Sequence, residues 1–265
     1  MNKSDYLQLA IDCALNAGEL LLKGFGTLFS VEYKPGKYNL VTEYDKKAEQ
    51  QILNQISAKY PSHTFLAEES GASLSHHSVI WIIDPLDGTV NFARGIPVFS
   101  VSIGVCVEGE ITCGVVYQPI TQELFFAEKG QGAFLQKGKE GTLKKLAVTQ
   151  ESDLNNTFLA TGFPYNVDEN PLHCIETFDA LSRKGIPLRR LGSAAIDLSY
   201  VAAGRFDGYW EVSLQPWDLA AGKLLVEEAG GKVTRYDGSL IDPLQAGTMV
   251  ATNGYIHKAL IRELQ

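Results

Sequence analysis

The chain has 265 residues, of which 45% are hydrophobic and 20% are charged, and its net charge is −8 at pH 7. This length and apolar content are enough to bury a sizeable core, and no long polar stretch divides the sequence, so we expect one globular unit over residues 1–265. The acidic balance argues against a chain that binds nucleic acid or a membrane surface, because either polyanion calls for a basic face.

The first 25 residues contain Asp5, Asp12 and Glu19 within an apolar pattern, which is unlike the uninterrupted apolar core of a secretory signal peptide. No eighteen apolar residues follow one another anywhere in the chain. We therefore predict a cytoplasmic protein with no membrane partner. The four cysteines show no Cys-x-x-Cys spacing, which favours buried free thiols over a zinc site or a disulfide framework.

Two helices are predicted at the start of the chain. Apolar residues recur at helical spacing from Leu7 to Leu22, and a second helix is expected from about Asp45 to Ala58. The apolar run 79–83 then predicts a buried strand, because it is short and rich in β-branched residues.

An antiparallel meander is expected next. From Phe99 to Val107 large apolar residues alternate with small or polar ones, as in a strand. Turn signals separate three further strands, at 111–117, 123–128 and 133–136. Parallel neighbours would need long crossovers between these strands. The pattern therefore favours an α+β layered architecture over a doubly wound parallel sheet.

The C-terminal half alternates helices and strands. A helix capped by Ser193 is expected to reach residue 203, with a strand over 206–212. Asp218 fits the N-cap of the next helix, and a strand over 232–236 follows Gly230-Gly231. We therefore predict two lobes, at approximately residues 1–145 and 146–265.

The densest chemistry in the sequence lies between Trp81 and Thr89, which reads Trp-Ile-Ile-Asp-Pro-Leu-Asp-Gly-Thr. Asp84 and Asp87 stand in a Pro/Gly turn at the end of an apolar strand. Buried strands rarely end in two acids unless a cation meets them. This segment therefore predicts a metal site.

Further acids stand at structural transitions, and each also has a purely structural explanation. Thr42-x-x-Asp45 fits a capping box, Asp218 fits an N-cap, and the pair Glu68-Glu69 fits a solvated loop after the strand-like run 64–67. If the acids converge, two carboxylates about 4 Å apart repel by about 4 kcal/mol at an effective dielectric constant near 20, so cations or raised pKa values are required. Oxygen ligands without His or Cys favour Mg²⁺ or Mn²⁺ over Zn²⁺.

Phosphatases that form an aspartyl-phosphate also end a strand in two acids, as Asp-x-Asp-Gly-Thr. Here Asp84 and Asp87 are three residues apart rather than two, in a turn that contains proline. The second acid would not reach the position of that family's acid/base, so we reject this interpretation on spacing.

The order of these motifs closely resembles the inositol monophosphatase family over nearly the whole chain. The matching segments are Asn39-Leu-Val-Thr-Glu-Tyr-Asp45, Glu68-Glu69-Ser70, the stretch from Trp81 to Phe92, Gly130-Gln-Gly132-Ala-Phe, Gly192-Ser193-Ala194-Ala195, and Trp217-Asp218 through Gly231. The resemblance implies a layered αβαβα sandwich of the sugar-phosphatase type, which is often a homodimer.

The resemblance also implies a ligand set for two or three Mg²⁺ ions. Glu68, Asp84 and the backbone carbonyl of Leu86 would hold one ion. Asp84, Asp87 and Asp218 would hold a second, and a third, weaker ion would lie by Glu68. Mn²⁺ is a possible substitute for Mg²⁺.

The remaining roles carried over from the family are catalytic and substrate-binding. Asp45 and Thr89 would orient and deprotonate the attacking water, with Glu68 as a further catalytic group, and the N–H groups of Gly88 and Thr89 would bind phosphate. The substrate's alcohol would meet Asp87, Gly192, Ser193, Ala194, Glu211 and Thr161, and Lys34 would assist near the metal. For Glu211 a surface acid at a strand end is the alternative.

The implied activity is Mg²⁺-dependent, lithium-sensitive hydrolysis of inositol 1-phosphate, or of a similar polyol or sugar monophosphate, by a metal-activated water. Related enzymes act on fructose 1,6-bisphosphate, the 2′-phosphate of NADP or 3′-phosphoadenylate, and Arg189 and Arg190 keep a bisphosphate substrate open. A surface or dimer-interface pair is the alternative for these arginines. From a different class, a regulatory binding protein that uses the same fold remains open.

Overall fold

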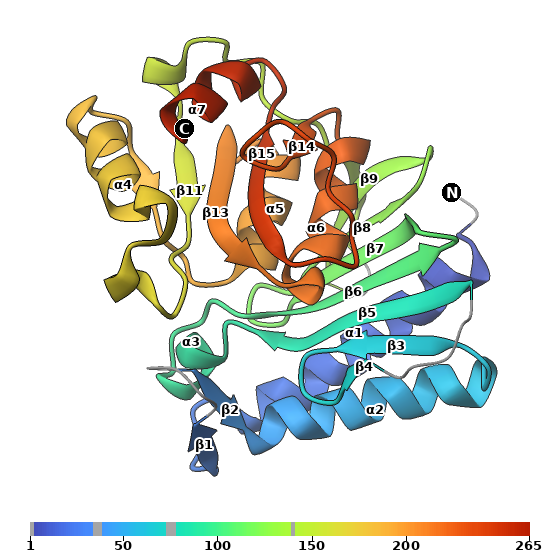
Figure 1. Ribbon diagram of the computed structural model, residues 1–265. Helices are drawn as coiled ribbons and strands as arrows, with labels where there is room; N and C mark the ends of the chain where they lie inside the picture. Colours follow the sequence, from blue (N-terminus) through green and yellow to red (C-terminus); the bar gives the residue numbers. More distant parts are fainter. Residues whose placement is uncertain (1–2, 34–38, 73–77, 139–140) are drawn as a thin grey trace.

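A computed structural model describes residues 3–33, 39–72, 78–138 and 141–265. Two β-sheets organise the chain (Figure 1). The larger sheet has the strand order β10-β9-β8-β7-β6-β5-β3-β4, and the smaller one has the order β12-β11-β13-β15-β14. The bounds of the larger sheet's strands are β3 Thr64–Ala67, β4 Gly71–Ala72, β5 Val79–Asp87, β6 Ser100–Val107, β7 Glu110–Gln118, β8 Glu123–Glu128, β9 Gly132–Lys137 and β10 Leu143–Lys145.

The smaller sheet is built from the C-terminal half. Its strands are β11 Leu159–Thr161, β12 Leu188–Arg189, β13 Gly208–Leu214, β14 Lys232–Thr234 and β15 Gly247–Thr252, and a separate two-stranded ladder joins β1 Val31–Tyr33 to β2 Leu40–Thr42. The helices are α1 Asp5–Gly24, α2 Glu43–Lys59, α3 Thr89–Ala93, α4 Cys174–Arg183, α5 Ala194–Ala202, α6 Pro216–Glu228 and α7 His257–Glu263, with 3₁₀ turns at Leu154–Asn156, Val167–Glu169 and Pro171–His173.

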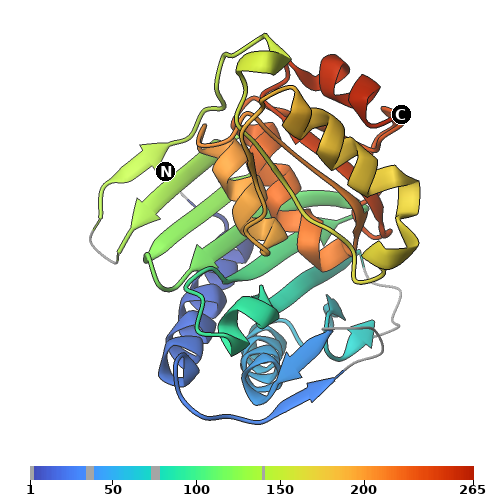
Figure 2. The ribbon, with the colours of Figure 1, turned by 90° about the vertical axis from the view of Figure 1, so that its left-hand side faces the viewer.

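Five layers follow one another through the molecule (Figures 1 and 2). Helices α1 and α2 cover one face of the larger sheet, and α6 packs on its other face beside α5. The pair α5 and α6 also contacts the smaller sheet, whose outer face is closed by an apolar cluster that includes α4 and α7. The αβαβα order implied by the resemblance is thus confirmed. The predicted boundary near residue 145 stays a prediction.

The predicted meander is confirmed, because β5 to β10 are consecutive antiparallel neighbours. Both faces of β6 are buried, since helices lie on each side of the sheet. On the α6 side the meander carries glycines where the helix approaches most closely. A Cβ atom on Gly104 would lie 2.9 Å from Cβ of Ala220, and one on Gly114 would lie 2.8 Å from the carbonyl oxygen of Ala221.

Several sequence predictions need adjustment. The second helix begins at Glu43 rather than Asp45, because Thr42 caps it. The strand expected at 206–212 runs from Gly208 to Leu214, and the strand at 232–236 ends at Thr234. All four cysteines are free and buried, as expected. No helix in the described part of the chain is both long and apolar enough to span a bilayer.

Candidate active site

Glu68 and Asp84 lie side by side where the pairing of the parallel strands β3 and β5 ends. The last pair is Ala67 opposite Ile83, so Glu68, which follows β3, is next to Asp84 within β5. The N–H group of Glu68 donates to the carbonyl of Ile83 at 3.1 Å. This bond fixes the backbone of Glu68 beside Asp84.

A bulge in β5 turns Asp84 and Asp87 to the same face of the sheet. Asp84 pairs with Ser102 and Asp87 with Ser100, so three steps along β5 oppose two along β6. In a regular strand an odd spacing would send the two side chains to opposite faces, and the extra residue compensates for it. The N–H of Leu86 donates to Oδ1 of Asp84 at 3.0 Å and closes the turn. Only 2% of Asp84 and 8% of Asp87 remain exposed.

The start of α5 orients Asp87. Its Oδ2 atom accepts hydrogen bonds from the N–H of Ala195 at 2.9 Å and from the hydroxyl of Ser193. Ser193 also caps α5 through the N–H of Ile196, as predicted. A helix N-terminus favours a negative charge, so α5 stabilises the ionised form of Asp87. The same contacts place the predicted substrate segment 192–194 beside this carboxylate.

Asp218 lies in the first turn of α6, but the prediction that it is the N-cap is wrong. The helix begins at Pro216, because proline suits the first helical position, where no N–H bond is required. Gln215 is the N-cap, and its N–H donates to Oδ2 of Asp218 at 2.7 Å. Asp218 is therefore held at the third helical position.

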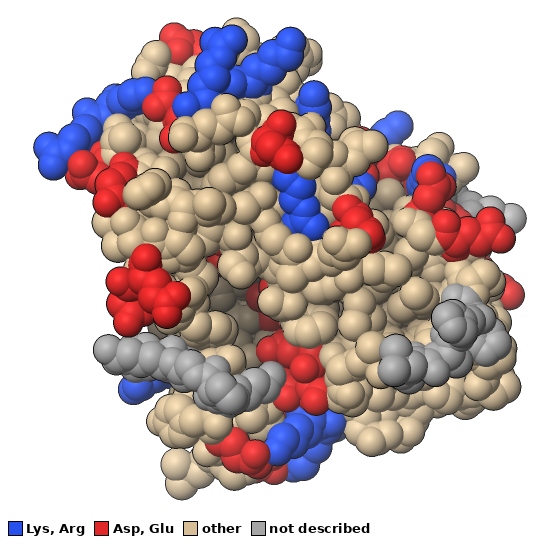
Figure 3. Space-filling model, viewed as in Figure 1, with Lys and Arg blue, Asp and Glu red and all other residues tan. Residues whose placement is uncertain are grey.

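Glu68, Asp84, Asp87 and Asp218 form one acidic cluster. Burial is the main cause that raises the pKa of Asp84 well above its usual range, and the charges of the other three acids raise it further. Burial also raises the pKa of Asp218, followed by the charge of Asp87. The pKa of Asp87 is raised by burial against its hydrogen bonds from Ser193 and α5. Figure 3 shows a hollow in this face of the molecule with acidic atoms visible inside it.

The chemistry of the acidic cluster fits a hard divalent cation. Its donors are carboxylate oxygens, with the Leu86 carbonyl in the same turn, and these are the ligands that Mg²⁺ and Mn²⁺ prefer. The charges of Glu68, Asp87 and Asp218 raise the pKa of Asp84, and a bound cation would act in the opposite direction. In the described ranges no three His, Cys, Asp or Glu side chains form a ready-made ion site. The four acids are therefore grouped together, but not in the geometry of a bound ion.

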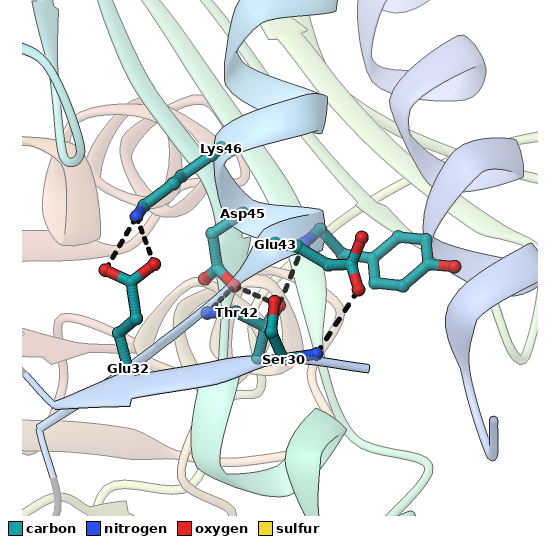
Figure 4. Close-up of polar contacts among 7 residues, drawn as sticks. Ser30, Glu32, Thr42, Glu43, Asp45 and Lys46 are labelled. Atoms are coloured by element: carbon teal, nitrogen blue, oxygen red, sulfur yellow. Dashed lines mark hydrogen bonds and ion pairs between the residues drawn. The ribbon is translucent and has the colours of Figure 1, made fainter. Parts of the chain in front are cut away.

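Asp45 and Thr89 form a buried pair that joins the starts of α2 and α3. Oδ1 of Asp45 accepts a hydrogen bond from the Thr89 hydroxyl at 2.9 Å, and Oδ2 accepts two from the backbone and side chain of Thr42 at 2.8 and 2.5 Å. The bond from the Thr42 N–H is one half of the predicted capping box (Figure 4), and in the other half the Thr42 hydroxyl accepts from the backbone N–H of Asp45. Burial raises the pKa of Asp45 to about 6, against these hydrogen bonds. The Thr89 hydroxyl also lies 3.0 Å from the carbonyl oxygen of Leu86, which connects the pair to the turn between Asp84 and Asp87.

Gly88 occupies a turn that no other residue fits well. Its φ angle is +91°, and an added Cβ atom would lie 3.0 Å from the carbonyl of Val98 and 3.2 Å from that of Gly192. The turn brings the backbone of Gly88 and Thr89 to the start of the five-residue helix α3, next to the acidic cluster. Their assignment to phosphate stays a prediction.

Glu211 is half-buried on β13 rather than lying free at a strand end. Its Oε2 atom accepts a hydrogen bond from the Tyr209 hydroxyl, and Gly162 leaves space for it, because a Cβ there would lie 2.0 Å from Oε2. Burial raises the pKa of Glu211 to about 7, the bond from Tyr209 lowers it, and Asp87 and Arg190 act on it in opposite directions. Glu211 is therefore close to the acidic cluster.

The other predicted substrate residues differ in how they are placed. Gly192 is exposed and Ala194 is the half-buried first residue of α5. Thr161 is buried, and its hydroxyl donates to the carbonyl of Trp210 at 2.8 Å, which gives it a structural role between β11 and β13. A contact of Thr161 with substrate stays a prediction. Lys34 lies outside the described residues.

Sequence comparison places the chain among known proteins. The model of the inositol monophosphatase family matches residues 2–265. The chain belongs to this family. It is 42% identical over 261 residues to Nus factor SuhB of Escherichia coli K12, with 98% of this chain and 95% of the relative covered. It is 40% identical over 258 residues to the inositol-1-monophosphatase of Caulobacter vibrioides, with 96% and 99% covered.

Solved structures of other proteins share this fold. The extragenic suppressor protein SuhB from Bartonella henselae superposes with a TM-score of 0.90 at 38% identity, and the match covers 99% of both chains. The IMPase of Thermotoga maritima gives a TM-score of 0.87 at 32% identity, with 98% of this chain and 97% of that chain covered.

Four polar residues around the site were given no role from the sequence. Tyr209 shares a strand face with Glu211, a spacing of two that could have revealed it. The Asn91 amide donates to the carbonyls of Val98 and Leu191, each at 2.8 Å, and so ties α3 to the substrate segment. Asp197 and Glu49 are buried acids on helices. In the described structure Oδ1 of Asp197 has no hydrogen-bond partner.

Proposed function

We propose that the protein is a Mg²⁺-dependent phosphomonoesterase that hydrolyses inositol 1-phosphate or a similar polyol or sugar monophosphate. The observation that carries this proposal is the buried Asp45–Thr89 pair next to an acidic cluster in which Asp84 and Asp87 share one face. A proton acceptor and a set of cation ligands then border the same turn. Family membership supports a phosphatase, and the relative named inositol-1-monophosphatase supports the substrate class.

The acidic cluster and the Leu86 carbonyl would hold two or three ions. Bound Mg²⁺ would neutralise phosphate charge, lower the pKa of the attacking water and stabilise the leaving alkoxide. Asp45 would accept the water's proton through the Thr89 hydroxyl, which its bond to Asp45 already orients. The N–H groups of Gly88 and Thr89 would donate to phosphate oxygens. The reaction would need no phosphorylated enzyme residue.

The test is the initial rate of phosphate release from myo-inositol 1-phosphate as Mg²⁺ is raised from zero. Strong Mg²⁺-dependent release is expected. Fructose 1,6-bisphosphate, NADP and 3′-phosphoadenosine 5′-phosphate should be measured in parallel, because the acidic cluster alone does not select among them. Release from one of these and none from the inositol ester would overturn the substrate while keeping the phosphatase.

The arginines that kept a bisphosphate substrate open lie against aromatic rings. The guanidinium carbon of Arg189 lies 4.7 Å from the ring centre of Phe158, and that of Arg190 lies 5.5 Å from the ring centre of Phe163. Arg190 also lowers the pKa of Glu211, so it is close to the proposed alcohol site. It would be the cation for a second phosphate if a bisphosphate proves to be the substrate.

Replacing Glu211 with Gln is expected to change substrate choice more than chemistry. The carboxylate would accept hydrogen bonds from ring hydroxyls, and one bond to a charged group is worth about 1.5–3 kcal/mol. We expect kcat/KM for inositol 1-phosphate to fall about tenfold or more, since 1.4 kcal/mol corresponds to a factor of ten. The control is 4-nitrophenyl phosphate, which has no ring hydroxyls and should be hydrolysed at a nearly unchanged rate. An equal loss on both substrates would contradict this role.

Three finer properties also remain proposals. We expect Li⁺ to inhibit turnover by competing for a Mg²⁺ site, which a Li⁺ titration at fixed Mg²⁺ measures. We expect a homodimer, and light scattering during size-exclusion chromatography measures the molar mass that tests it. We expect a cytoplasmic location without a membrane or nucleic-acid partner, which cell fractionation and a binding assay with RNA address.

A regulatory binding role is the second candidate, and the relatives named Nus factor SuhB favour it. The two candidates differ in what the acidic cluster does. If the chain captures a protein partner equally well with Asp84 intact or replaced by Asn, and releases no phosphate from any ester tested, the binding role is the better account. Turnover that depends on Asp84 supports the enzyme.

A further inference from the structure

Glu49 is a buried acid that the roles assigned above do not use. It lies in α2, and only 4% of it is exposed. Its Oε2 atom accepts a hydrogen bond from the N–H of Glu69 at 2.8 Å, and the backbone and side chain of Ser70 also hydrogen-bond to its carboxylate. These donors belong to the loop that joins β3 to β4. Glu49 therefore binds this loop from the helix side.

The loop bound by Glu49 carries Glu68, a member of the acidic cluster. Strands β3 and β4 pair with Ala67 opposite Gly71, so residues 68–70 form a tight hairpin loop. On one side the N–H of Glu68 is bonded to β5, and one residue later Glu69 is bonded to Glu49. The backbone on which the Glu68 carboxylate stands is thus held from two directions.

The charge of Glu49 is costly at this position. Burial raises its pKa, and so does the nearby charge of Glu69, while the hydrogen bonds from the loop lower it. An apolar side chain could fill the space beneath the loop without that cost, but it could not bind the loop's N–H groups. What the carboxylate contributes here is the fixed conformation of residues 68–70.

Asp45 and Glu49 are four residues apart, so they share one face of α2. Asp45 contacts Thr89 from this face, and Glu49 contacts the Glu68 loop. One rigid helix therefore sets the position of the proposed base and the position of a proposed metal ligand at the same time.

We propose that Glu49 is a positioning residue that fixes the 68–70 loop, so that Glu68 is held ready beside Asp84 for a divalent ion. The inference rests on the proposed function only in that the acidic cluster binds such an ion. Partners outside the ligand shell typically change metal affinity about 10- to 100-fold when they are removed. We expect a loss of this size when Glu49 loses its charge.

The experiment compares Glu49→Gln with Glu43→Gln. The first variant keeps the shape and one oxygen acceptor, but replaces the other oxygen with an NH₂ group that cannot accept from the loop. The second makes the same chemical change in the same helix, where the carboxylate contacts Ser30 and Lys47, away from the acidic cluster. Mn²⁺ binding to metal-free protein, measured by calorimetry, should weaken about 10- to 100-fold for Glu49→Gln and stay unchanged for Glu43→Gln. For Glu49→Gln, the Mg²⁺ concentration that gives half-maximal turnover should rise, and kcat at saturating Mg²⁺ should be largely kept.

Wild-type affinity for Mn²⁺ in folded Glu49→Gln would overturn the inference, and so would an equal loss in both variants. If Glu49→Gln does not fold, Glu49→Asp decides, because it keeps the charge but is one methylene shorter. It should bind Mn²⁺ more weakly than the wild type, and unchanged affinity would refute the role. The outcomes also separate the two proposals. Wild-type protein that binds Mn²⁺ and hydrolyses no ester would end the proposed function, and weaker binding by Glu49→Gln would still support the positioning role.

Discussion

Replacing Asp84 with Asn is expected to lower the rate of phosphate release by more than about 10³-fold, beyond the 10²–10³-fold loss typical of removing one donor that stabilises a developing charge. Asn keeps the shape of the side chain but removes a charge from the middle of the acidic cluster. Its NH₂ group would also face Glu68, Asp87 or Asp218, whose charges now act on Asp84. Asp218→Asn should behave in the same way.

The same substitution should stabilise the protein in the absence of metal. A buried acid whose pKa is raised in the folded state destabilises the protein as the pH rises above the pKa that the acid has in the unfolded chain. Asn cannot ionise, so it does not have this effect. Thermal unfolding in a chelator should therefore show Asp84→Asn above the wild type at neutral pH, with the difference vanishing in acid. Mg²⁺ at about 100 times its Kd should stabilise the wild type by about 2.7 kcal/mol, and the variant much less.

Asp179→Asn is the matched control, because Asp179 is an exposed acid on α4 paired with Arg183. It should leave turnover and the Mg²⁺ effect unchanged. Near-normal turnover of Asp84→Asn at ordinary Mg²⁺ would refute the assignment of the acidic cluster. If Asp84→Asn instead unfolds at a lower temperature than the wild type without metal, the acidic cluster is not held together against repulsion between its carboxylates.

The strongly patterned parts of this fold could be predicted from the sequence, and the long-range parts could not. Strand β8 was expected at its observed bounds, 123–128, because turn residues flank it on both sides. Strand β11 was missed, since three residues show no alternation, and its parallel partner β13 begins about 50 residues later. Helices α4 and α7 were missed as well.

The candidate site shows the same division. The sequence places Asp84 and Asp87 in one turn, but their common face depends on a bulge opposite Ser100 and Ser102 that only strand pairing reveals. Asp218 was expected at a helix start, yet its position in the first turn was mistaken, because Pro216 moves the start of α6. Glu49 gave no sequence signal, since its partners lie 20 residues away on a different element.

Asp45 should set the acidic limb of the pH–rate profile. Its pKa is raised to about 6 by burial, and only the ionised carboxylate accepts a proton. The rate should therefore rise with pH through about 6 and level off above it. The measurement is kcat at saturating Mg²⁺ across this range. Asp45→Asn should lower kcat by about 10²–10⁴-fold, the range for general-base catalysis, and should remove the rising limb.

Two variants of Thr89 test whether Asp45 takes the water's proton through the Thr89 hydroxyl. Thr89→Val keeps the shape and removes the group that donates to Asp45, whereas Thr89→Ser keeps that group. If the two residues act as one unit, Thr89→Val should lose about as much activity as Asp45→Asn, and the double variant should lose little more, because residues that act together are not additive. Thr89→Ser should retain most of the rate. Losses that multiply in the double variant would show that Asp45 and Thr89 act separately.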